Sequence, residues 1–484
     1  MKYYCLFLLI YSPFLLTAQC ECPSLPDDQT NRTVVTVSTV AELQSALQDC
    51  HSNNGNYTIL LEDGEYELTN NLLYIGENMI NLTIRSVSGD RDAVIIRGQG
   101  MNGNVGYIFN VAADNFTAAD MTIGWISNHA IQIHAEHDAD NCLIQNVRFV
   151  DTKEQMLKVS GSASPTFSNG GIVQCCLFEF PDGVAYQYYT GGIDAHRAKD
   201  WEVRYNTFKH IRSPDSGLAE HAIHFWSDSE NTLVENNWVI NCDRGIGFGL
   251  GSSGHQGGMI RNNFVHTSRD VGIGMENSPN TKVYHNTVIT DNYFNSIEYR
   301  FEGTVNVHIV NNLTNEAIRS RNDGTGNIES NFETMDLSIF TDMANYDYHL
   351  STAISQITDA GIILADAGDD YDCHSRTIDG MPDIGADEFN SILSSIFSPL
   401  KYSALDVYPN PAAEKITLNL TSFCISILNI SITDSLGRIL YSEATNIDDK
   451  NTSLDISISH FPPGIYHLVV SDKKSVFSKT ITKL

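Results

Sequence analysis

The sequence of 484 residues lacks several features that would place it in common functional classes. It has no Cys-x-x-Cys pair, so neither a zinc ribbon nor a thiol redox motif is supported. Basic residues are scarce, with 29 Lys and Arg against 59 Asp and Glu, and the formal net charge of −30 argues against nucleic acid as a partner. Beyond the N-terminus no stretch is long and apolar enough to cross a bilayer, so we expect no transmembrane segment.

The first residues have the pattern of an export signal. Met1-Lys2 precedes a short apolar run, and Thr17-Ala18 supplies small residues, which predicts a secretory signal peptide over residues 1–18. Cys20 leaves a lipoprotein open as an alternative, although Gln19 is a poor residue before a lipid-modified Cys.

The ten Cys residues fall into groups with different expected states. Cys5 leaves with the signal, so an odd number remains and at least one should be unpaired. Three lie near the start of the mature chain and are candidates for pairing in an oxidising compartment: Cys20, Cys22 and Cys50. Others lie in or beside predicted strands, where a small buried apolar role is expected: Cys142, either Cys175 or Cys176, and Cys242.

A repeated strand unit fills the middle of the chain. Six tetrads alternate apolar and polar residues in one phase: Leu157-Lys158-Val159-Ser160, Ile193-Asp194-Ala195-His196, Ile223-His224-Phe225-Trp226, Ile246-Gly247-Phe248-Gly249, Ile273-Gly274-Met275-Glu276 and Ile297-Glu298-Tyr299-Arg300. After each of the last five tetrads comes a strand with an Asn beside apolar residues, and these Asn are spaced by 31, 26, 23 and 26 residues: Asn206, Asn237, Asn263, Asn286 and Asn312. Such a period is typical of a solenoid.

Period-two alternation places the apolar members of each tetrad on one face and the polar members on the other. A single strand cannot bury such a face, but stacked coils form one continuous core with a polar outer surface. We therefore predict an all-β protein, a right-handed parallel β-helix over residues 19–389. The recurring Asn should stack at the bends as a hydrogen-bonded ladder, where left-handed backbone is tolerated.

The region before the repeats predicts a cap for the open end of the solenoid. Thr39 and Glu42 form a capping box, and apolar residues follow at helical spacing, which predicts a short amphipathic helix. An alternating strand over 57–68 and a second over 82–85 come next. This Val-Ala-Glu-Leu helix followed by an apolar strand and a Gly turn resembles the N-terminal region of pectate-lyase-like β-helices.

The periodicity ends near residue 332, and an acidic segment follows. Its Asp residues make Ca²⁺ a candidate ion, but their spacing is not that of an EF-hand, and a solvated closing loop is the alternative. No cofactor is required by the sequence. The segment Asp383-Ile384-Gly385-Ala386-Asp387-Glu388 resembles the closing tail of exported bacterial β-helix proteins.

The last eighty residues have a different composition. After a Ser- and Pro-containing linker over 390–403, short alternating strands predict a small β-sandwich over 404–484. Val407-Tyr408-Pro409-Asn410-Pro411, Asp434-Ser435-Leu436-Gly437-Arg438 and Pro463-Gly464-Ile465-Tyr466 resemble the C-terminal sorting domain of the type IX secretion pathway. The resemblance implies the type IX secretion machinery as a partner and a secreted or cell-surface location.

Outward side chains of successive coils lie about 4.8 Å apart, so the polar members of the tetrads form two columns. One column reads Lys158, Asp194, His224, Gly247, Gly274, Glu298, Arg319, and the other reads Ser160, His196, Trp226, Gly249, Glu276, Arg300, Arg321. Ionisable groups concentrate in the first three coils, which favours a discrete site over an adhesin-like ladder. The Gly residues leave room either for a ligand or for a packed loop.

This set suits proton abstraction beside a carboxyl group. Removing the C5 proton of a uronate requires a cation for the carboxylate and a base, and β-elimination then requires an acid for the leaving oxygen. The candidate catalytic residues are Lys158, His196, Arg197 and His224. The candidate substrate-binding residues are Asp194, His221, Trp226, Glu276 and Arg300, and whether a metal takes part is left open. Asp194 has either of two roles, orienting a His or holding a metal, and Trp226 is a stacking face or a packed aromatic.

Two family resemblances bear on the same segment. Gln155-Met156-Leu157-Lys158-Val159-Ser160 and Gly192-Ile193-Asp194-Ala195-His196-Arg197 resemble the chondroitinase-B and alginate-lyase β-helices, and this implies that Lys158 and Arg197 act on a uronate. Gly192-Ile193-Asp194-Ala195-His196 also resembles the Asp-Pro-His segment of mannuronan epimerases, with Ala195 in place of Pro.

The sequence thus predicts a secreted, monomeric lyase that acts on an acidic polysaccharide. A C5 epimerase and a non-catalytic glycan-binding or adhesin β-helix remain alternatives. A glycoside hydrolase is disfavoured, because inverting cleavage needs paired carboxylates and the columns supply one Asp, Asp194.

Overall fold

The computed structural model describes residues 22–70, 73–161, 163, 165–377, 380–389, 405–421, 426–434, 438–447, 451–471 and 476–484. The predicted signal peptide, Cys20 and the predicted linker lie outside these residues. The chain divides into two compact units, one ending at Glu388 and one beginning at Phe389. Among the described residues no helix combines the length and apolar character needed to cross a membrane.

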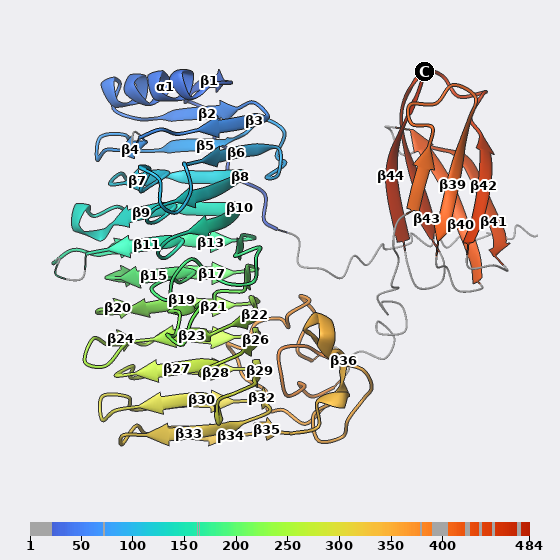
Figure 1. Cartoon of the computed structure of the whole chain (residues 1–484). Coiled ribbons are helices and arrows are strands. Elements are labelled where there is room, and N and C mark those ends of the chain that lie inside the picture. The colour runs from blue at the N-terminus through green and yellow to red at the C-terminus, as the bar shows by residue number, and fades with distance from the viewer. Residues whose placement is uncertain are drawn as a thin grey trace, which may run out of the picture. The chain divides into compact units, whose positions relative to one another are not determined.

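The first unit is a parallel β-helix of about 11 turns, which confirms the predicted fold (Figure 1). One face is a ten-stranded parallel sheet made by β4 (Tyr74–Ile75), β7 (Phe109–Val111), β9 (Ile131–His134), β11 (Leu157–Ser160), β15 (Ile193–His196), β19 (His221–Trp226), β23 (Arg244–Phe248), β27 (Ile273–Glu276), β30 (Asn295–Arg300) and β33 (Ala317–Arg321). The predicted tetrads therefore occupy one sheet.

Two further stacks of parallel strands complete the coils and are joined through the long strands β8 (Thr117–Ile126) and β10 (Leu143–Thr152). One continues through β1 (Thr33–Val37), β2 (Tyr57–Leu61), β5 (Leu82–Ser86), β13 (Ile172–Gln174), β17 (Glu202–Arg204), β21 (Leu233–Glu235), β25 (Met259–Arg261), β28 (Lys282–Tyr284), β31 (Val307–Val310) and β34 (Gly326–Glu329). The other continues through β3 (Gly64–Glu67), β6 (Val94–Arg97), β14 (Leu177–Glu179), β18 (Thr207–Lys209), β22 (Trp238–Cys242), β26 (Phe264–Thr267), β29 (Thr287–Thr290), β32 (Leu313–Thr314) and β35 (Phe332–Glu333).

A short fourth sheet extends four of the coils. It consists of β12 (Ser168–Asn169), β16 (Ala198–Lys199), β20 (Ser229–Glu230) and β24 (His255–Gln256). A single 3-10 turn, η1 (Ala135–His137), follows β9.

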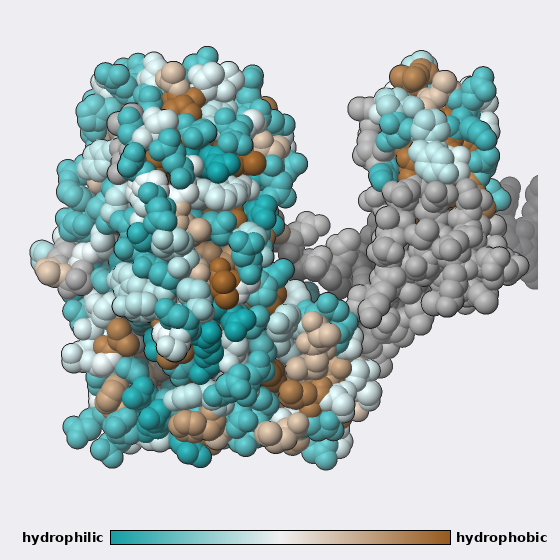
Figure 2. Space-filling view, viewed as in Figure 1, coloured by the Kyte–Doolittle hydropathy of each residue, from teal (hydrophilic) through white to brown (hydrophobic). Residues whose placement is uncertain are grey.

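The interior is apolar because the inward residue at each strand position meets the equivalent residue of the next coil. Phe149, Phe178 and Phe208 stack face to face, with ring centroids 4.3 and 4.5 Å apart. The face of the first unit seen in Figure 2 is mostly hydrophilic, with scattered apolar residues. This distribution is the one that stacked amphipathic strands require.

The predicted Asn ladder is present. Asn237 Nδ2 donates to Asn263 Oδ1 at 3.0 Å, and Asn263 Nδ2 donates to Asn286 Oδ1 at 2.9 Å. The left-handed backbone lies one residue earlier than expected, since positive φ occurs at Asn236 and Asn262 and not at the ladder residues themselves. The ladder Asn are buried and satisfy the amides of the bend.

The predicted cap is helix α1 (Val40–Ser52), which lies at one end of the solenoid (Figure 1). Thr39 Oγ1 accepts from the Glu42 amide at 3.2 Å, and Glu42 Oε2 accepts from the Thr39 amide at 3.0 Å, as the capping box predicts. The buried side of α1, with Leu43 and Leu47, covers the first coil.

The cysteines depart from expectation at Cys50. Cys22, one of the candidates for pairing, forms a disulfide with Cys175 that fastens the N-terminal segment to a coil 153 residues away, and of Cys175 and Cys176 the second is the free buried thiol. Cys50 is buried and unpaired rather than a disulfide partner, since α1 turns it into the core. Cys142, Cys176 and Cys242 are free and buried, as predicted.

The segment after the last coil packs against the solenoid instead of extending it (Figure 1). It contains η2 (Leu337–Ile339), η3 (Met343–Asn345) and an antiparallel pair, β36 (Phe340–Asp342) and β37 (Asp347–Leu350). Arg376 anchors it, since Nη2 donates to Asn262 Oδ1 at 2.7 Å and Nη1 pairs with Glu388 at 2.8 Å.

The second unit consists of two antiparallel sheets, consistent with the predicted sandwich. One contains β38 (Leu405–Tyr408), β39 (Lys415–Thr421) and β42 (Asn451–Ser457), and the other contains β40 (Ser426–Asp434), β41 (Ile439–Ile447), β43 (Gly464–Ser471) and β44 (Val476–Lys483). Its own apolar core includes Ile416, Leu418, Ile432 and Leu468.

Candidate active site

The parallel register of the ten-stranded sheet brings the two predicted outward columns together. Lys158 lies opposite Asp194, and Asp194 lies opposite His224. In the second column His196 lies opposite Trp226, and Glu276 lies opposite Arg300. Residues 158, 194, 196, 224 and 226 thus form one cluster on three adjacent coils.

Asp194 is the centre of the cluster. One carboxylate oxygen, Oδ1, accepts the indole N–H of Trp226 at 2.6 Å, and the other, Oδ2, is paired closely with the Lys158 ammonium. His196 Nε2 and His224 Nδ1 each lie 3.7 Å from an oxygen of the same carboxylate. The side chain of Asp194 is only 5% exposed, so a single buried anion organises an ammonium, two imidazoles and an indole.

Lys158 and His196 form the outer layer. Lys158 Nζ lies 3.0 Å from His196 Nε2, and because an ammonium can only donate, Nε2 accepts this hydrogen bond. The side chains of Lys158 and His196 are 12% and 13% exposed, against 1% for His224. Among Lys158, His196 and His224, the first two are therefore the ones that solvent can reach.

The cluster combines an ionised carboxylate with neutral imidazoles. Burial opposes ionisation of Asp194, but the charge of Lys158 and the two imidazoles outweigh it, and the pKa of this carboxyl is lowered. Burial and then the neighbouring Lys158 charge lower the pKa of His196 to about 4, although Asp194 acts in the opposite direction. Burial likewise lowers the pKa of His224. Near neutral pH His196 is an unprotonated base beside an ammonium.

His224 and His221 form the inner layer. His224 Nε2 donates to the carbonyl of Gly249 at 3.2 Å, and the His224 ring stacks on Trp226 at 5.5 Å. The His221 ring lies 4.4 Å from that of His224, and burial lowers its pKa well below the usual value. Neither Nδ1 has a hydrogen-bond partner among the described residues.

The glycines of the two columns accommodate packed protein. A Cβ on Gly247 would lie 2.7 Å from His221 Nε2, so the absence of a side chain there lets the His221 ring pack. The turn at 249–254 also lies on this face, where the Gly251 amide donates to Glu276 Oε2 at 2.6 Å. The sequence left a ligand or a packed loop open for this space, and at Gly247 the structure shows a third use, the His221 ring of β19.

Arg197 lies apart from the cluster. Its backbone has a positive φ of 53°, and its guanidinium contacts Asp228 at 3.2 Å and the carbonyls of Pro165 and Thr166. The guanidinium also covers the ring of Phe167 at 4.0 Å. The structure thus gives Arg197 partners on the neighbouring loop and none among the five clustered residues.

Glu276 and Arg300 form a second polar group further along the same face. Arg300 Nη1 pairs with Glu276 Oε1 at 2.6 Å. Next to them Glu298 is buried and accepts from Tyr293 Oη at 2.7 Å and from Arg321 Nη1 at 3.0 Å. Arginines therefore continue the outward columns beyond the glycine coils.

The sequence reasoning missed His134 and Glu136 on the preceding coil. His134 lies opposite Ser160, its Nδ1 lies 2.7 Å from Glu136 Oε1, and Ser160 Oγ donates to the same carboxylate at 3.0 Å. Ile131-Gln132-Ile133-His134 has the same alternation as the six tetrads, so extending the repeat one coil earlier would have found His134.

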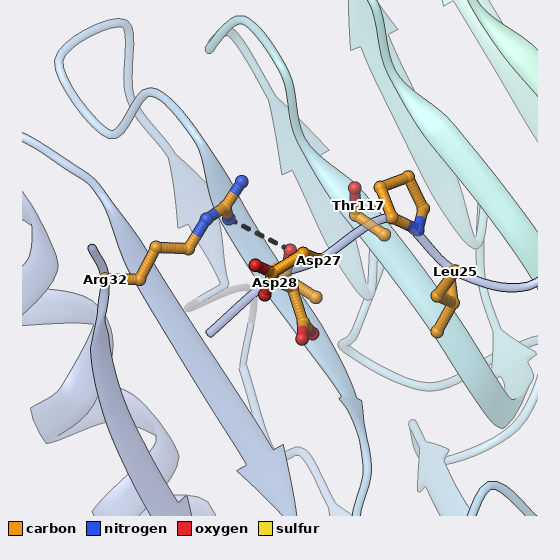
Figure 3. Close-up of a pocket in the computed structure, with 7 residues that line it drawn as sticks. Leu25, Asp27, Asp28, Arg32 and Thr117 are labelled. Atoms are coloured by element: carbon orange, nitrogen blue, oxygen red, sulfur yellow. Dashed lines mark hydrogen bonds between the residues drawn. The ribbon is translucent and has the colours of Figure 1, made fainter. Parts of the chain in front are cut away.

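A small pocket elsewhere holds none of these residues. It is lined by the N-terminal segment, including Leu25, Asp27, Asp28 and Arg32, and by residues of β5 and β8 (Figure 3). Arg32 Nη1 donates to Asn81 O at 2.7 Å and to Thr83 Oγ1 at 3.1 Å. These contacts hold the N-terminal segment against the coils.

Two family models match parts of the chain. Residues 406–483 match the secretion system C-terminal sorting domain. The tail is that of an exported protein. This confirms the predicted type IX sorting tail and the predicted secreted or cell-surface location. Residues 182–331 match the family described as periplasmic copper-binding protein (NosD), over coils that include most of the cluster.

Similar solved structures include β-helix enzymes that act on polysaccharides. Pectate lyase Pel9A has 12% identity, covers 75% of this chain and 98% of its own, and has a TM-score of 0.49. Pectate lyase Bsp165PelA from Bacillus sp. N165 has 15% identity, covers 49% of this chain and 70% of its own, and has a TM-score of 0.35. Iota-carrageenase has 10% identity, covers 69% of this chain and 99% of its own, and has a TM-score of 0.34. At these identities the likeness does not extend to an activity. No curated protein matches the chain.

Proposed function

We propose that the protein is a polysaccharide lyase that abstracts the C5 proton of a uronic acid residue and cleaves the glycosidic bond by β-elimination. The observation that supports this proposal is the outer pair, a Lys158 ammonium beside the neutral imidazole of His196, held over the buried carboxylate of Asp194. A cation and a base at one point of a polar face are the two groups that this reaction requires.

In this proposal Lys158 takes the substrate carboxylate and His196 takes the proton. The C5–H bond breaks, its proton goes to His196 Nε2, and its electron pair forms the double bond between C4 and C5. The C4–O bond breaks at the same time, and the leaving oxygen takes a proton from solvent. The product carries an unsaturated end, which absorbs in the ultraviolet.

Substrate binding strengthens the proposed base. The charge of Lys158 is one cause of the low pKa of His196, after burial. A uronate carboxylate placed on Lys158 offsets that charge and draws the ammonium away from Nε2. The pKa of His196 then rises, and its lone pair is released where the C5 proton arrives.

The remaining residues have supporting roles in the proposal. Asp194 orients Lys158 and the Trp226 indole, and the buried His224 positions Trp226 through ring stacking. Glu276 and Arg300, further along the columns, contact more distant sugars of an acidic polymer. Arg197 is left out of the mechanism because its guanidinium is already occupied by Asp228 and two carbonyls.

The test is a polymer panel with a matched pair of variants. The full chain without its signal peptide is incubated with alginate, pectate, chondroitin and glucuronan while ultraviolet absorbance is followed. We expect a rise on one polymer, loss of that rise in His196→Asn, and retention in His210→Asn, a half-buried His of the same coil. If no polymer gives a rise, lyase activity is excluded for this panel, and proton exchange at C5 or release of reducing ends on the same samples identifies an epimerase or a hydrolase.

A second candidate function is binding of a copper ion in the same coils. The NosD family is described as copper-binding, and within the matched range Glu220, His221 and His224 offer three ligand atoms within 4.8 Å of one another. Imidazole and carboxylate donors suit Cu²⁺, and the unpaired Nδ1 atoms of two buried rings fit such an ion. Copper would supply redox or Lewis acid chemistry there.

Titration with Cu²⁺ separates the two candidates. Copper binding that is lost in His221→Ala, with no ultraviolet product on any polymer, favours the copper protein. His255→Ala is the matched control, because His255 is also buried but pairs with Thr232 at 2.9 Å outside the trio.

A further inference from the structure

The segment that closes the solenoid brings together two His and three Asp from different parts of its length. His349 comes from β37, Asp370, Asp372 and His374 come from one turn, and Asp387 comes from the end of the segment. One atom each from His349, Asp372 and Asp387 lies within 4.8 Å of the others, and the same holds for Asp370, His374 and Asp387. The two triads share the carboxylate of Asp387.

The imidazole nitrogens point to an ion rather than to a hydrogen-bonded network. His349 Nε2 and both ring nitrogens of His374 are buried and have no hydrogen-bond partner among the described residues. The nearest carboxylate oxygens, on Asp372 and Asp370, lie at 3.5 and 3.4 Å, beyond normal hydrogen-bond length. Buried polar atoms of this kind are usually satisfied, so a missing partner is indicated.

The other nitrogen of His349 is held as metal-bound imidazoles usually are. His349 Nδ1 lies 2.5 Å from Asp347 Oδ1, which fixes the ring and directs Nε2 toward Asp372 and Asp387. A carboxylate that orients a His in this way is the common outer shell of a metal site. It is an observation independent of the acidic character of the segment.

The basic side chains near the cluster already have other partners. Arg376 pairs with Glu388 and donates to the carbonyls of Gly385 and Ala386, and Lys282 pairs with Asp366 on the solenoid. The carboxylate of Asp370 already accepts the amides of His374 and Glu388, at 2.6 and 3.0 Å. Hydrogen bonds therefore already occupy part of the triad of Asp370, His374 and Asp387, and an ion has better access to the ligand atoms of His349, Asp372 and Asp387.

We propose that His349, Asp372 and Asp387 bind a first-row divalent transition metal ion that cross-links the closing segment where it packs on the solenoid, with Asp370 and His374 beside it. Imidazole with carboxylates suits Zn²⁺ and its neighbours, whereas Ca²⁺ takes oxygen ligands. The segment packs on the coils here, since the rings of His349 and Tyr371 lie 5.0 and 4.5 Å from Phe264 of β26. A bound ion would link three separate turns of that segment at this contact.

Zn²⁺ binding to the full chain without its signal peptide, tag-free and stripped with chelator, tests the proposal by calorimetry and by the melting temperature. We expect a saturable site, a higher melting temperature with Zn²⁺, and loss of both effects in His349→Ala. Asp347→Asn leaves all three ligands in place and should weaken binding about 10- to 100-fold. The matched control is His308→Ala, an exposed His on β31 that should bind as wild type does.

Three results would overturn the proposal: no Zn²⁺ binding by the wild type, Zn²⁺ binding that survives unchanged in both His349→Ala and Asp347→Asn, or a site that takes Ca²⁺ in preference to Zn²⁺. Should His349→Ala fail to fold, Asp347→Asn alone decides. Neither readout involves polysaccharide cleavage, so the outcome is independent of the proposed lyase activity.

Discussion

At the residue scale, the arrangement around Asp194 explains why a Lys and a His can work as a pair. Asp194 is an almost fully buried anion that must be compensated, and Lys158 compensates it while also donating to His196. Removing one partner of a buried ion pair typically costs about 3–5 kcal/mol of stability, because the other charge is left unpaired. Loss of activity in a Lys158 variant therefore needs to be separated from loss of fold.

A double variant makes that separation. We expect Lys158→Met to lower kcat/KM at least about 100-fold, as loss of a group acting in the transition state does, and also to lower the free energy of unfolding. Lys158→Met combined with Asp194→Asn removes both charges and should recover much of the stability but none of the activity. Kinetics and denaturant unfolding of both variants check this.

The half-exposed ion pair of Lys199 and Glu230 provides the control, because Lys199→Met removes the same charge on another sheet. That variant should retain both activity and stability. Recovery of activity in the double variant would contradict the role assigned to Lys158.

The pH profile reports the proposed base directly. Because burial and Lys158 lower the pKa of His196 to about 4, the base stays unprotonated down to mildly acidic pH. We expect kcat/KM, which reflects the free enzyme, to fall as pH drops through about 4. The acid limb of kcat should lie at higher pH, because a bound uronate offsets the charge of Lys158.

Stopped assays across pH 3–8 measure the acid limbs of the kcat and kcat/KM profiles. Coincident limbs for kcat and kcat/KM would show that the substrate does not alter the pKa of the base, and the proposed coupling would then be wrong.

Residue roles were only partly predictable from the sequence. Period-two alternation identifies Lys158, Asp194, His196 and His224 as outward residues of adjacent coils, and the structure places them together. Strand alternation does not predict the partners of Arg197. This residue lies just past β15, where its positive φ turns the side chain toward a loop. The disulfide between Cys22 and Cys175 was equally hidden, since contacts across 153 residues leave no local pattern.

At the element scale, the Asn ladder holds the bends of successive coils in register. Asn263 Nδ2 donates to Asn286 and to the carbonyls of Val234 and Arg261, and Asn263 Oδ1 accepts from Asn237. The ladder was predictable because one residue type recurs at the coil period. The left-handed position was misplaced by one residue, because the sequence alone does not show which residue of the bend turns.

Replacing one ladder residue should be costly. Asn263→Ala leaves several buried groups unpaired, and each unsatisfied group costs about 1–3 kcal/mol, so we expect a loss of about 2–4 kcal/mol in the free energy of unfolding. Asn327→Ala, on the exposed strand β34, should change stability by less than about 0.5 kcal/mol. Chemical denaturation of both variants tests this. Equal effects would mean that the ladder contributes no more than a surface Asn.

At the scale of the whole molecule, the proposed site and the sorting tail belong to different units of the chain. The cluster and the closing segment lie in the first unit, and the match to sorting domains covers 406–483 in the second, which has its own apolar core. Turn chemistry and alternating strands identified both units from the sequence. Removing the second unit should therefore change where the protein goes and leave unchanged what the first unit does.

A truncation tests this division in a host that has the type IX pathway. The full chain should be found outside the outer membrane, and a chain ending at residue 388 should remain in the periplasm. The truncated protein, once purified, should show the same melting temperature for the β-helix and the same activity on the polymer that the full chain cleaves. Full-length Lys199→Met is the control for export, since its change leaves the tail intact. Export of the truncated chain would show that the β-helix carries its own sorting information, and lost activity would show that the tail takes part in the site.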